Sequence, residues 1–371
     1  MPIEECEIII PIWNQPGITQ SCIEAIIKNT RYPYRLILID NGSDSETKRY
    51  LKGLKRQDDP RITLLRNEAN LGFVKAVNQG MRASRARFLC IMNNDTTPAP
   101  GWLERLVGFA QAHPQIGLMN PACDGDPRVS LDEHARLAEA KKGTYLEVNQ
   151  CFLFATLVKR EVIDKIGYLD EAFGAGCWED ADYCMRAHKA GYRCAIVYSS
   201  YVHHIHGVSF KARGDRDCLV IQGEKEFLKK WGKPPRIAAA FVLKKDGPEE
   251  EIENFLKTLL SLAREWCWIN AWIFGDAPKT QARIKDAQDR LGIPTHQNIR
   301  FNFFPRAFAY PQIIARIAER SFGTKRRKRY DMILVNDRKM SSFLASTYPL
   351  HKIDIMPCNI NKGNIKSAPP N

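Results

Sequence analysis

The sequence predicts an α/β protein in which helices cover both faces of a mostly parallel sheet, followed by a second, smaller α/β unit with a Rossmann-like order. Short apolar runs typical of buried strands alternate with segments whose apolar residues have helical spacing. Most strand-like runs of the first part end in Asn, Asp, Ser or Gly. The alternation stops at 231–235 (Trp-Gly-Lys-Pro-Pro) and then starts again, so we expect two domains, residues 1–233 and 234–371.

The first domain is expected to open with four strands that alternate with four helices. Apolar runs predict strands at 7–12, 34–40, 62–65 and 88–92, and helical spacing predicts helices at 19–28, 47–54, 73–83 and 102–112. A less regular region follows at 117–149. Beyond it we expect a strand at 151–155, a helix at 160–166, a helix that begins near Glu179 and a strand at 194–198.

The second domain repeats the alternation. Strands are predicted at 237–243, 269–274, 299–304, 332–335 and 352–356, and helices at 249–264, 281–291, 311–320 and near 340. This pattern indicates another parallel sheet, but we recognise no catalytic group of residues in it. Acceptor binding, membrane docking and assembly all stay open as its role.

Composition limits the location and the partners. No run approaches the ~18 apolar residues of a membrane span, and the acidic start of the chain lacks the features of a signal peptide, so we expect a cytoplasmic protein. The 11 cysteines include no Cys-x-x-Cys pair and are expected to be free thiols.

The net charge of +13 predicts an anionic partner. The basic run 325–329 fits either a solvated surface segment or a peripheral contact with a membrane on its cytoplasmic face. No recognisable nucleic-acid-binding module is present, so nucleic acid is not the expected partner.

The strand at 88–92 runs directly into Asn93, Asn94 and Asp95. Ligands of open α/β sheets bind at the carboxyl ends of strands, which makes these side chains candidates for a binding site. The chain has neither a Gly-x-Gly-x-x-Gly segment after its first strand nor a Gly-Lys-Ser/Thr loop. If phosphates bind at this edge, a divalent cation held by Asp95 would neutralise them.

Two further stretches carry groups that suit the same chemistry. Glu179 and Asp180 are expected in the first turn of a helix, where they act either as favourable helix-terminal charges or as a general base that stays ionised at neutral pH. Asp182 and Arg186 are spaced to form a pair on that helix. Among the crowded histidines, His204 and His206 point the same way on an extended segment and suit contact with a metal or a phosphate. The polar segment that follows, with Lys211, Arg213 and Arg216, is expected to close over a diphosphate.

Taken together, these stretches resemble an inverting family 2 glycosyltransferase of the GT-A fold over residues 7–233, especially members that transfer rhamnose or galactofuranose. The matching motifs stand in family order at 10–14, 38–44, 67–78, 92–95 and 178–183, with the histidine segment before 207–209. The resemblance implies a GT-A nucleotide-diphospho-sugar transferase domain.

The resemblance also implies a role for individual residues. Asp180 would be the catalytic base, with Glu179 beside it, and Trp178 would either stack on an acceptor sugar or belong to the core. Asp95 matches the last carboxylate of the family's Asp-x-Asp motif, whose first Asp is replaced by Asn93, and it would hold Mn²⁺ or Mg²⁺ with His204 or His206. The implied donor-binding residues are Pro11, Trp13, Asn14, Asp40 (on the base or ribose), Ser43, Asn70, Gly72, Lys75, Asn78, Asn93 and Asn94.

The implied reaction moves a sugar from a nucleoside-diphosphate donor to a hydroxyl of a glycan or a lipid-linked acceptor, with inversion. A sugar nucleotidyltransferase is one alternative, but residues 13–17 lack the Gly-rich basic loop that it would need. A non-catalytic protein that binds nucleotides or glycans is the other alternative, and the presence of Asp95 and Asp180 argues against it.

Overall fold

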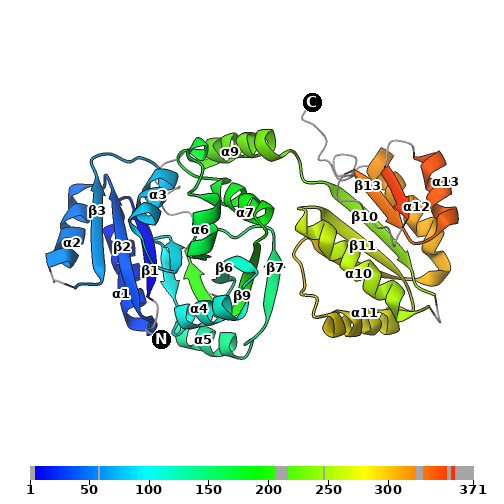
Figure 1. Cartoon of the computed structure of the whole chain (residues 1–371), viewed down its shortest axis with the longest axis horizontal. Helices are drawn as coiled ribbons and strands as arrows, with labels where there is room; N and C mark the ends of the chain where they lie inside the picture. The colour runs from blue at the N-terminus through cyan, green and yellow to red at the C-terminus, as the bar shows by residue number, and fades with distance from the viewer. Residues whose placement is uncertain are drawn as a thin grey trace. The chain divides into compact units, whose positions relative to one another are not determined.

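The computed structural model describes residues 5–56, 59–126, 128–205, 216–244, 247–322, 329–348 and 352–355. It divides into two compact units, residues 1–230 and 231–371. Each unit consists of one sheet covered by helices (Figure 1), which confirms the predicted α/β class with a second, smaller sheet. The division after residue 233 into domains with separate roles stays a prediction.

The first unit contains a nine-stranded sheet that is parallel at one end and mixed at the other. Its strand order is β3-β2-β1-β4-β8-β6-β9-β5, and β7 also pairs with β9. The first four neighbours are mutually parallel, whereas β8 runs antiparallel to both β4 and β6. The strands are β1 (Cys6–Ile12), β2 (Tyr34–Asn41), β3 (Ile62–Asn67), β4 (Phe88–Met92), β5 (Thr96–Pro98), β6 (Ile116–Ala122), β7 (Tyr145–Val148), β8 (Ala155–Lys159) and β9 (Arg193–His204).

The helices of the first unit follow the predicted alternation closely up to residue 112. They are α1 (Pro16–Asn29), α2 (Ser45–Arg56), α3 (Phe73–Ala83), α4 (Trp102–Ala112), α5 (Leu131–Glu139), α6 (Arg160–Ile166), the 3₁₀ turn η1 (Glu171–Phe173), α7 (Glu179–Lys189) and α9 (Arg216–Trp231). Two predictions are wrong in detail. The region 117–149 contains β6, α5 and β7, and the strand expected at 151–155 is β8, which begins at Ala155 because residues 149–154 form a loop.

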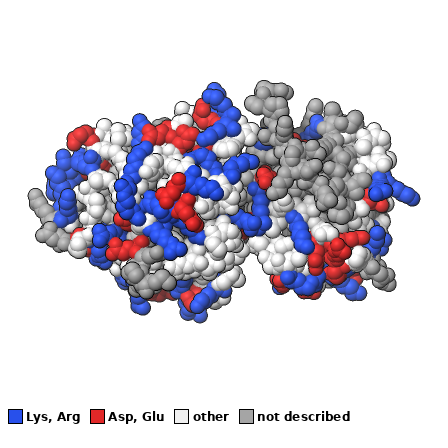
Figure 2. Space-filling model, in the orientation of Figure 1, with Lys and Arg blue, Asp and Glu red and all other residues white. Residues whose placement is uncertain are grey.

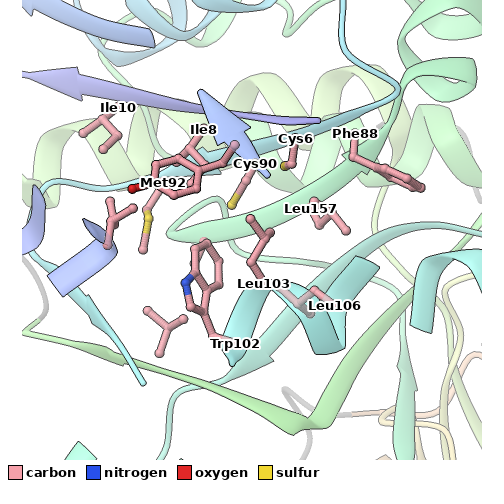
Figure 3. Packing of buried hydrophobic residues seen from close by; sticks show 14 of the residues in the cluster. Cys6, Ile8, Ile10, Phe88, Cys90, Met92, Trp102, Leu103, Leu106 and Leu157 are labelled. Atoms are coloured by element: carbon pink, nitrogen blue, oxygen red, sulfur yellow. The ribbon is translucent and has the colours of Figure 1, made fainter. Parts of the chain in front are cut away.

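The core beneath this sheet holds the carboxyl ends of β1 and β4 in place. Alternate residues of a strand point to the same face, so Ile8 and Ile10 of β1 and Cys90 and Met92 of β4 share one layer (Figure 3). This layer packs on Trp102 of α4, and all of these side chains are fully buried. The ten described cysteines are free thiols, as the sequence predicts.

The second unit is a five-stranded sheet of order β12-β11-β10-β13-β14 in which every pairing is parallel. Separate apolar clusters lie on its two faces: α10 and α11 cover one, and α12 and α13 cover the other. The elements are β10 (Arg236–Val242), α10 (Glu249–Arg264), β11 (Trp268–Gly275), α11 (Ala277–Leu291), β12 (Ile299–Pro305), the 3₁₀ turn η2 (Arg306–Phe308), α12 (Ala309–Phe322), β13 (Met332–Val335), α13 (Arg338–Thr347) and β14 (Lys352–Ile355).

Charge is distributed broadly over the surface. Figure 2 shows Lys and Arg side chains spread over the visible face of the first unit and interspersed with acidic ones. Residues 325–328, most of the predicted basic run, lie outside the described residues. Across the described ranges, no helix has the length and apolar character that a membrane crossing requires.

Candidate active site

A cavity of about 510 Å³ opens where β1 and β4 end, and both Asp95 and Asp180 line it. The sequence therefore pointed correctly to two acids, far apart in the chain, that share one cavity. The other predicted site residues in its wall are Pro11, Trp13, Asn70, Gly72, Asn93, Asn94, Trp178, Glu179 and His204.

Strand pairing brings Asp95 and His204 together. β5 pairs antiparallel with β9 so that Thr96 lies opposite His204, and the backbone N–H of Ile205 donates to the carbonyl oxygen of Asp95 (3.1 Å). His204 Nε2 donates to Asp95 Oδ1 (3.1 Å). The ring of Phe154 stacks on the imidazole at 5.1 Å and thus helps to fix its orientation.

This pair is suited to a divalent cation that is bound together with phosphate. A carboxylate and an imidazole are ligands that Mn²⁺ accepts, and both side chains are largely buried yet line the cavity. Within the part of the chain that the structure describes, no three His, Cys, Asp or Glu side chains form a metal-binding group. The remaining positions would therefore be filled by phosphate oxygens and water, as is usual for Mg²⁺ at phosphate sites. His206 lies outside the described residues.

The turn that carries Asp95 is held by its neighbours. Asn94 donates through Nδ2 to Thr19 Oγ1 (2.9 Å). The backbone N–H of Asn93 donates to the carbonyl oxygen of Phe154 (2.8 Å). Of the two amides, Asn94 therefore braces the turn against α1, and the side chain of Asn93 is the one left without a bracing contact of this kind.

Three predicted donor-binding residues do not line the cavity and instead connect the loops after β1 and β2. Asp40 is almost fully buried, forms an ion pair with Arg66 and accepts the backbone N–H of Ser43 (3.0 Å). Ser43 Oγ accepts the backbone N–H of Asn14 (3.0 Å). Because these side chains are engaged in structural contacts, the structure does not bring Asp40, Ser43 or Asn14 to the cavity wall.

Two predicted residues on α3 are also absent from the wall. Asn78 is fully buried and binds the backbone of Leu169 in both directions, because its Nδ2 donates to the Leu169 carbonyl and its Oδ1 accepts the Leu169 N–H (both 3.0 Å). Lys75 is exposed on α3. In this structure Asn78 connects α3 to the segment before η1, which accounts for it without a ligand contact.

An amide network shapes the wall between β2 and α3. Asn41, which the sequence-based site did not include, donates to Asn70 Oδ1 (2.9 Å) and accepts the backbone N–H of Leu71 (3.1 Å). Gly72 follows with a φ of +85°, and a Cβ there would lie only 3.1 Å from Ala175 Cα. Glycine is therefore needed at position 72 both for its backbone conformation and for the close approach of the 174–176 segment.

The start of α7 has an unusual backbone and is covered by α9. Cys177 and Trp178 have φ values of 77° and 70°, which is rare for residues with a side chain and is typical of constrained functional sites. Gly223 of α9 packs directly on Cys177, and Phe227 lies 5.1 Å from the Trp178 ring. Trp178 both lines the cavity and packs against α9, so its two predicted roles are compatible.

The carboxyl group of Asp180 has two hydrogen-bond donors. Its Oδ1 accepts from the backbone N–H of Ala181 (2.7 Å) and from Gln150 Nε2 (3.1 Å). Burial nevertheless raises the pKa of Asp180 to about 7. A base with a pKa near the working pH is well suited to catalysis.

The neighbouring groups sort into structural residues and cavity residues. Asp182 and Arg186 form the predicted pair (2.9 Å), and Lys230 of α9 also binds Asp182 (2.7 Å), so this buried acid is part of the packing between α7 and α9. Arg216 at the start of α9 lines the cavity. Lys211 and Arg213 lie outside the described residues.

The first unit is a mixed α/β fold with a cavity at the strand ends. Residues 7–166 match the model of the family described as "Glycosyl transferase family 2". This match lies within the first unit and agrees with the resemblance that its motifs predict.

Similar proteins carry related names. "Glycosyltransferase AglE" of Haloferax volcanii is 32% identical over 52% of this chain and 64% of its own length. "O-antigen biosynthesis protein RfbC" of Myxococcus xanthus is 24% identical over 56% of this chain and 18% of its own length. A solved mannosyltransferase of Pyrobaculum calidifontis in complex with GDP-Man and Mn²⁺ aligns at 17% identity with a TM-score of 0.44, covering 93% of this chain and 79% of that one. The chain spans less than two thirds of both named sequence relatives.

Proposed function

We propose that this protein transfers a sugar from a nucleoside-diphosphate donor to an acceptor hydroxyl, with inversion and with help from a divalent cation. The observation that carries the proposal is that the Asp95–His204 pair and Asp180 line the same cavity. The Asp95–His204 pair suits the diphosphate end of a donor, and Asp180 suits an acceptor hydroxyl.

Asp180 is the proposed general base. It takes the proton from the acceptor hydroxyl while the hydroxyl oxygen bonds to the anomeric carbon of the sugar, and the bond between that carbon and the diphosphate breaks on the opposite face. The proton ends on Asp180 and the nucleoside diphosphate leaves. The raised pKa of Asp180 favours this role because a more basic carboxylate accepts a proton more readily.

The diphosphate side is assigned to Asp95, His204 and Arg216. Asp95 and His204 would hold Mn²⁺ or Mg²⁺, which supplies positive charge to the leaving diphosphate when it is bound. Arg216 adds a permanent positive charge in the cavity wall. These charges stabilise the transition state more than the ground state, because negative charge grows on the diphosphate as it departs.

The donor's nucleoside is assigned to the wall formed by Pro11, Trp13 and the Asn41–Asn70 network. A glycan or a lipid-linked sugar is the proposed acceptor, and Trp178 is placed to stack on it. The name of the Myxococcus relative favours synthesis of a surface polysaccharide.

Nucleotide binding is tested first. Uridine, thymidine and guanosine diphosphates are compared in thermal unfolding, each with and without Mn²⁺, because a ligand that binds the folded state raises the unfolding temperature. One of them is expected to stabilise the protein, and more strongly with Mn²⁺. No stabilisation by any of the three would contradict a nucleoside-diphosphate site.

Turnover then separates the candidate functions. The corresponding nucleotide sugars are assayed for release of nucleoside diphosphate with and without glycan or lipid-linked acceptors. A glycosyltransferase releases the diphosphate, and faster with its acceptor. A sugar nucleotidyltransferase instead forms pyrophosphate from a nucleoside triphosphate and a sugar phosphate, and a binding protein releases neither.

A further inference from the structure

Gln150 is held against the first turn of α7 by the residue that follows it. Gln150 lies in the loop between β7 and β8, and its Nε2 donates to Asp180 Oδ1 (3.1 Å). The backbone N–H of Cys151 contacts Cys184 Sγ (3.2 Å), and the Cys184 thiol points back to the Cys151 carbonyl (3.8 Å). Cys184 stands one helical turn after Asp180. The loop is thus fastened along one face of α7, and this fixes where the Gln150 amide points.

Glu179 is bonded very differently, although it is the next residue in the chain. Its side chain is 7% exposed and lines the cavity. Its Oε2 is buried and has no hydrogen-bond partner among the described residues, and only the backbone N–H groups of Cys177 and of Glu179 itself favour its ionised form, with no side-chain donor of the kind that Gln150 provides to Asp180. A buried carboxylate with an unpaired oxygen is strongly disfavoured as an anion, whereas a carboxylate that accepts two N–H groups is favoured as one.

We propose that Glu179 and Asp180 share one proton at neutral pH, with the proton on Glu179 and the charge on Asp180, and that Gln150 is the positioning residue that fixes this assignment. Two adjacent acids in a poorly solvated place do not both ionise, because their charges repel each other. The unequal hydrogen bonding decides which of the two keeps the proton. The result is one neutral acid beside one ionised base, as in other paired carboxyl sites.

Burial raises the pKa of both acids, and the charge of Asp180 adds to the rise at Glu179. Asp182 is balanced by Arg186 and Lys230. The titratable or charged groups around the pair are Cys184, Asp182 and Arg186 on α7, Cys151 in the loop, Arg216 and Lys230 on α9, Cys194 and His204 on β9, and Asp95 after β4.

The assignment of the proton can be tested without turnover. Infrared difference spectra between pH 6 and pH 9 report protonated carboxyl groups through their carbonyl stretch. We expect Glu179→Gln to remove one titrating carboxyl band that Asp180→Asn retains. Glu46→Gln is the matched control, because Glu46 is also a first-turn acid but is exposed on α2. A band that persists in Glu179→Gln and disappears in Asp180→Asn would overturn the assignment, and so would its absence from the wild type.

The role of Gln150 depends on the proposed function, since it concerns the base of that reaction. Gln150→Met keeps the side-chain length but removes the donor to Asp180. We expect the acid limb of the plot of kcat/KM against pH to shift to higher pH by about one unit. The reason is that losing a hydrogen bond to the charged form of Asp180 raises the pKa of Asp180 by roughly this amount. Gln111→Met, at an exposed position on α4, is the control and leaves the limb in place.

The outcomes separate the inference from the proposed function. A merely structural role for Gln150 would lower kcat at every pH without moving the limb, and that result overturns the positioning role. If the wild type shows no transfer with any donor, the proposed function fails, but the infrared bands still decide where the proton lies. Unfolding midpoints of all variants, compared with the wild type, show whether each remains folded.

Discussion

The first four strands of each sheet follow the same order, but the two sheets differ in what lies at the point where that order reverses. In the first unit β3-β2-β1 is followed by β4, and in the second unit β12-β11-β10 is followed by β13. Such switch points are where open α/β sheets bind ligands. The first one opens into the cavity lined by Pro11 and Asp95. At the second one, Asn336 binds both the N–H and the carbonyl of Val242 (2.8 and 3.0 Å) and connects the two strand ends.

The difference lies in what the chain does after the switch point. Beyond β4 the sheet of the first unit becomes mixed, and the antiparallel pairing of β5 with β9 delivers His204 to Asp95. The 149–154 loop and α7 then add Gln150 and Asp180. The second unit continues with another parallel strand, β14. A parallel sheet therefore provides an edge, but the chemistry at that edge comes from elements added around it.

The sharpest test of this comparison replaces one acid at each edge. Asp180→Asn should lower kcat by about 10²–10⁴-fold, the usual contribution of a general base, because the amide cannot accept the proton. Nucleotide binding, followed by thermal shift, should be largely retained. Asp337→Asn is the matched change in the second unit, where Asp337 caps α13 by accepting the Met340 N–H (2.8 Å). Asn caps a helix equally well, so turnover should not change. Wild-type turnover in Asp180→Asn would remove Asp180 as the base.

The cation side gives the next largest effect. Asp95→Ala should weaken Mn²⁺-dependent nucleotide binding by more than about 10-fold, the effect of losing even an outer partner of a metal ligand. The measurement is the nucleotide-induced rise in unfolding temperature with and without Mn²⁺. Asp276→Ala serves as the control, because Asp276 also follows a parallel strand but belongs to the second unit. If Mn²⁺ dependence is unchanged in Asp95→Ala, the cation lies elsewhere.

The sequence predicted the regular parts of both sheets well. Helices α3, α4 and α10 begin and end at the predicted residues, because each combines a continuous amphipathic pattern with a clear stop. The mixed half of the first sheet was predicted poorly. β7 and β8 are short. β7 pairs with β9, and β8 pairs with β4 and β6, all of them distant in the chain. Local apolar patterns therefore carry little information about the pairing or the ends of these two strands.

In the candidate site, too, features set by local sequence were predicted, and features set by contacts between distant parts of the chain were not. Asp95 and Asp180 both line the cavity, and they stand at a strand end and a helix start, which are local features of sequence. Asp40 and Asn78 are absent from its wall, because a motif indicates that a polar residue matters but not whether it faces a cavity or a neighbouring loop. Phe154 was missed because it sits in a loop where a strand was predicted at 151–155, and Gln150 was missed because it directly precedes that stretch and no local pattern links it to Asp180.

A third test concerns the packing of α9 against the start of α7 in the first unit. A Cβ at Gly223 would overlap the carbonyl oxygen of Cys177 and come within 3.1 Å of the Cys177 carbonyl carbon and of the Trp178 ring. Gly223→Ala should therefore lower stability by about 1–3 kcal/mol through overpacking and reduce kcat by displacing α7. Denaturant unfolding and turnover measure the two effects.

Gly108→Ala is the matched control for this substitution. Gly108 lies on α4 with open space around it, so Ala should raise stability by about 0.5–1 kcal/mol through its better helix propensity. Equal effects of the two substitutions would mean that α9 does not brace the start of α7, and the account of how Asp180 is positioned would then have to change.

The smallest expected effect on activity comes from the switch point of the second sheet, where Asn336 connects the two strand ends. Asn336→Ala removes both hydrogen bonds to Val242, which should lower the stability of the second unit by about 1 kcal/mol because two partly buried backbone groups lose their partner. Hydrogen exchange at Val242 should speed up while turnover stays at the wild-type level. Asn41→Ala, at a strand end of the first sheet, should instead reduce turnover because Asn41 supports the cavity wall through Asn70. A loss of turnover in a folded Asn336→Ala variant would show that the strand ends of the second sheet also serve the reaction, and the contrast between the two switch points would no longer hold.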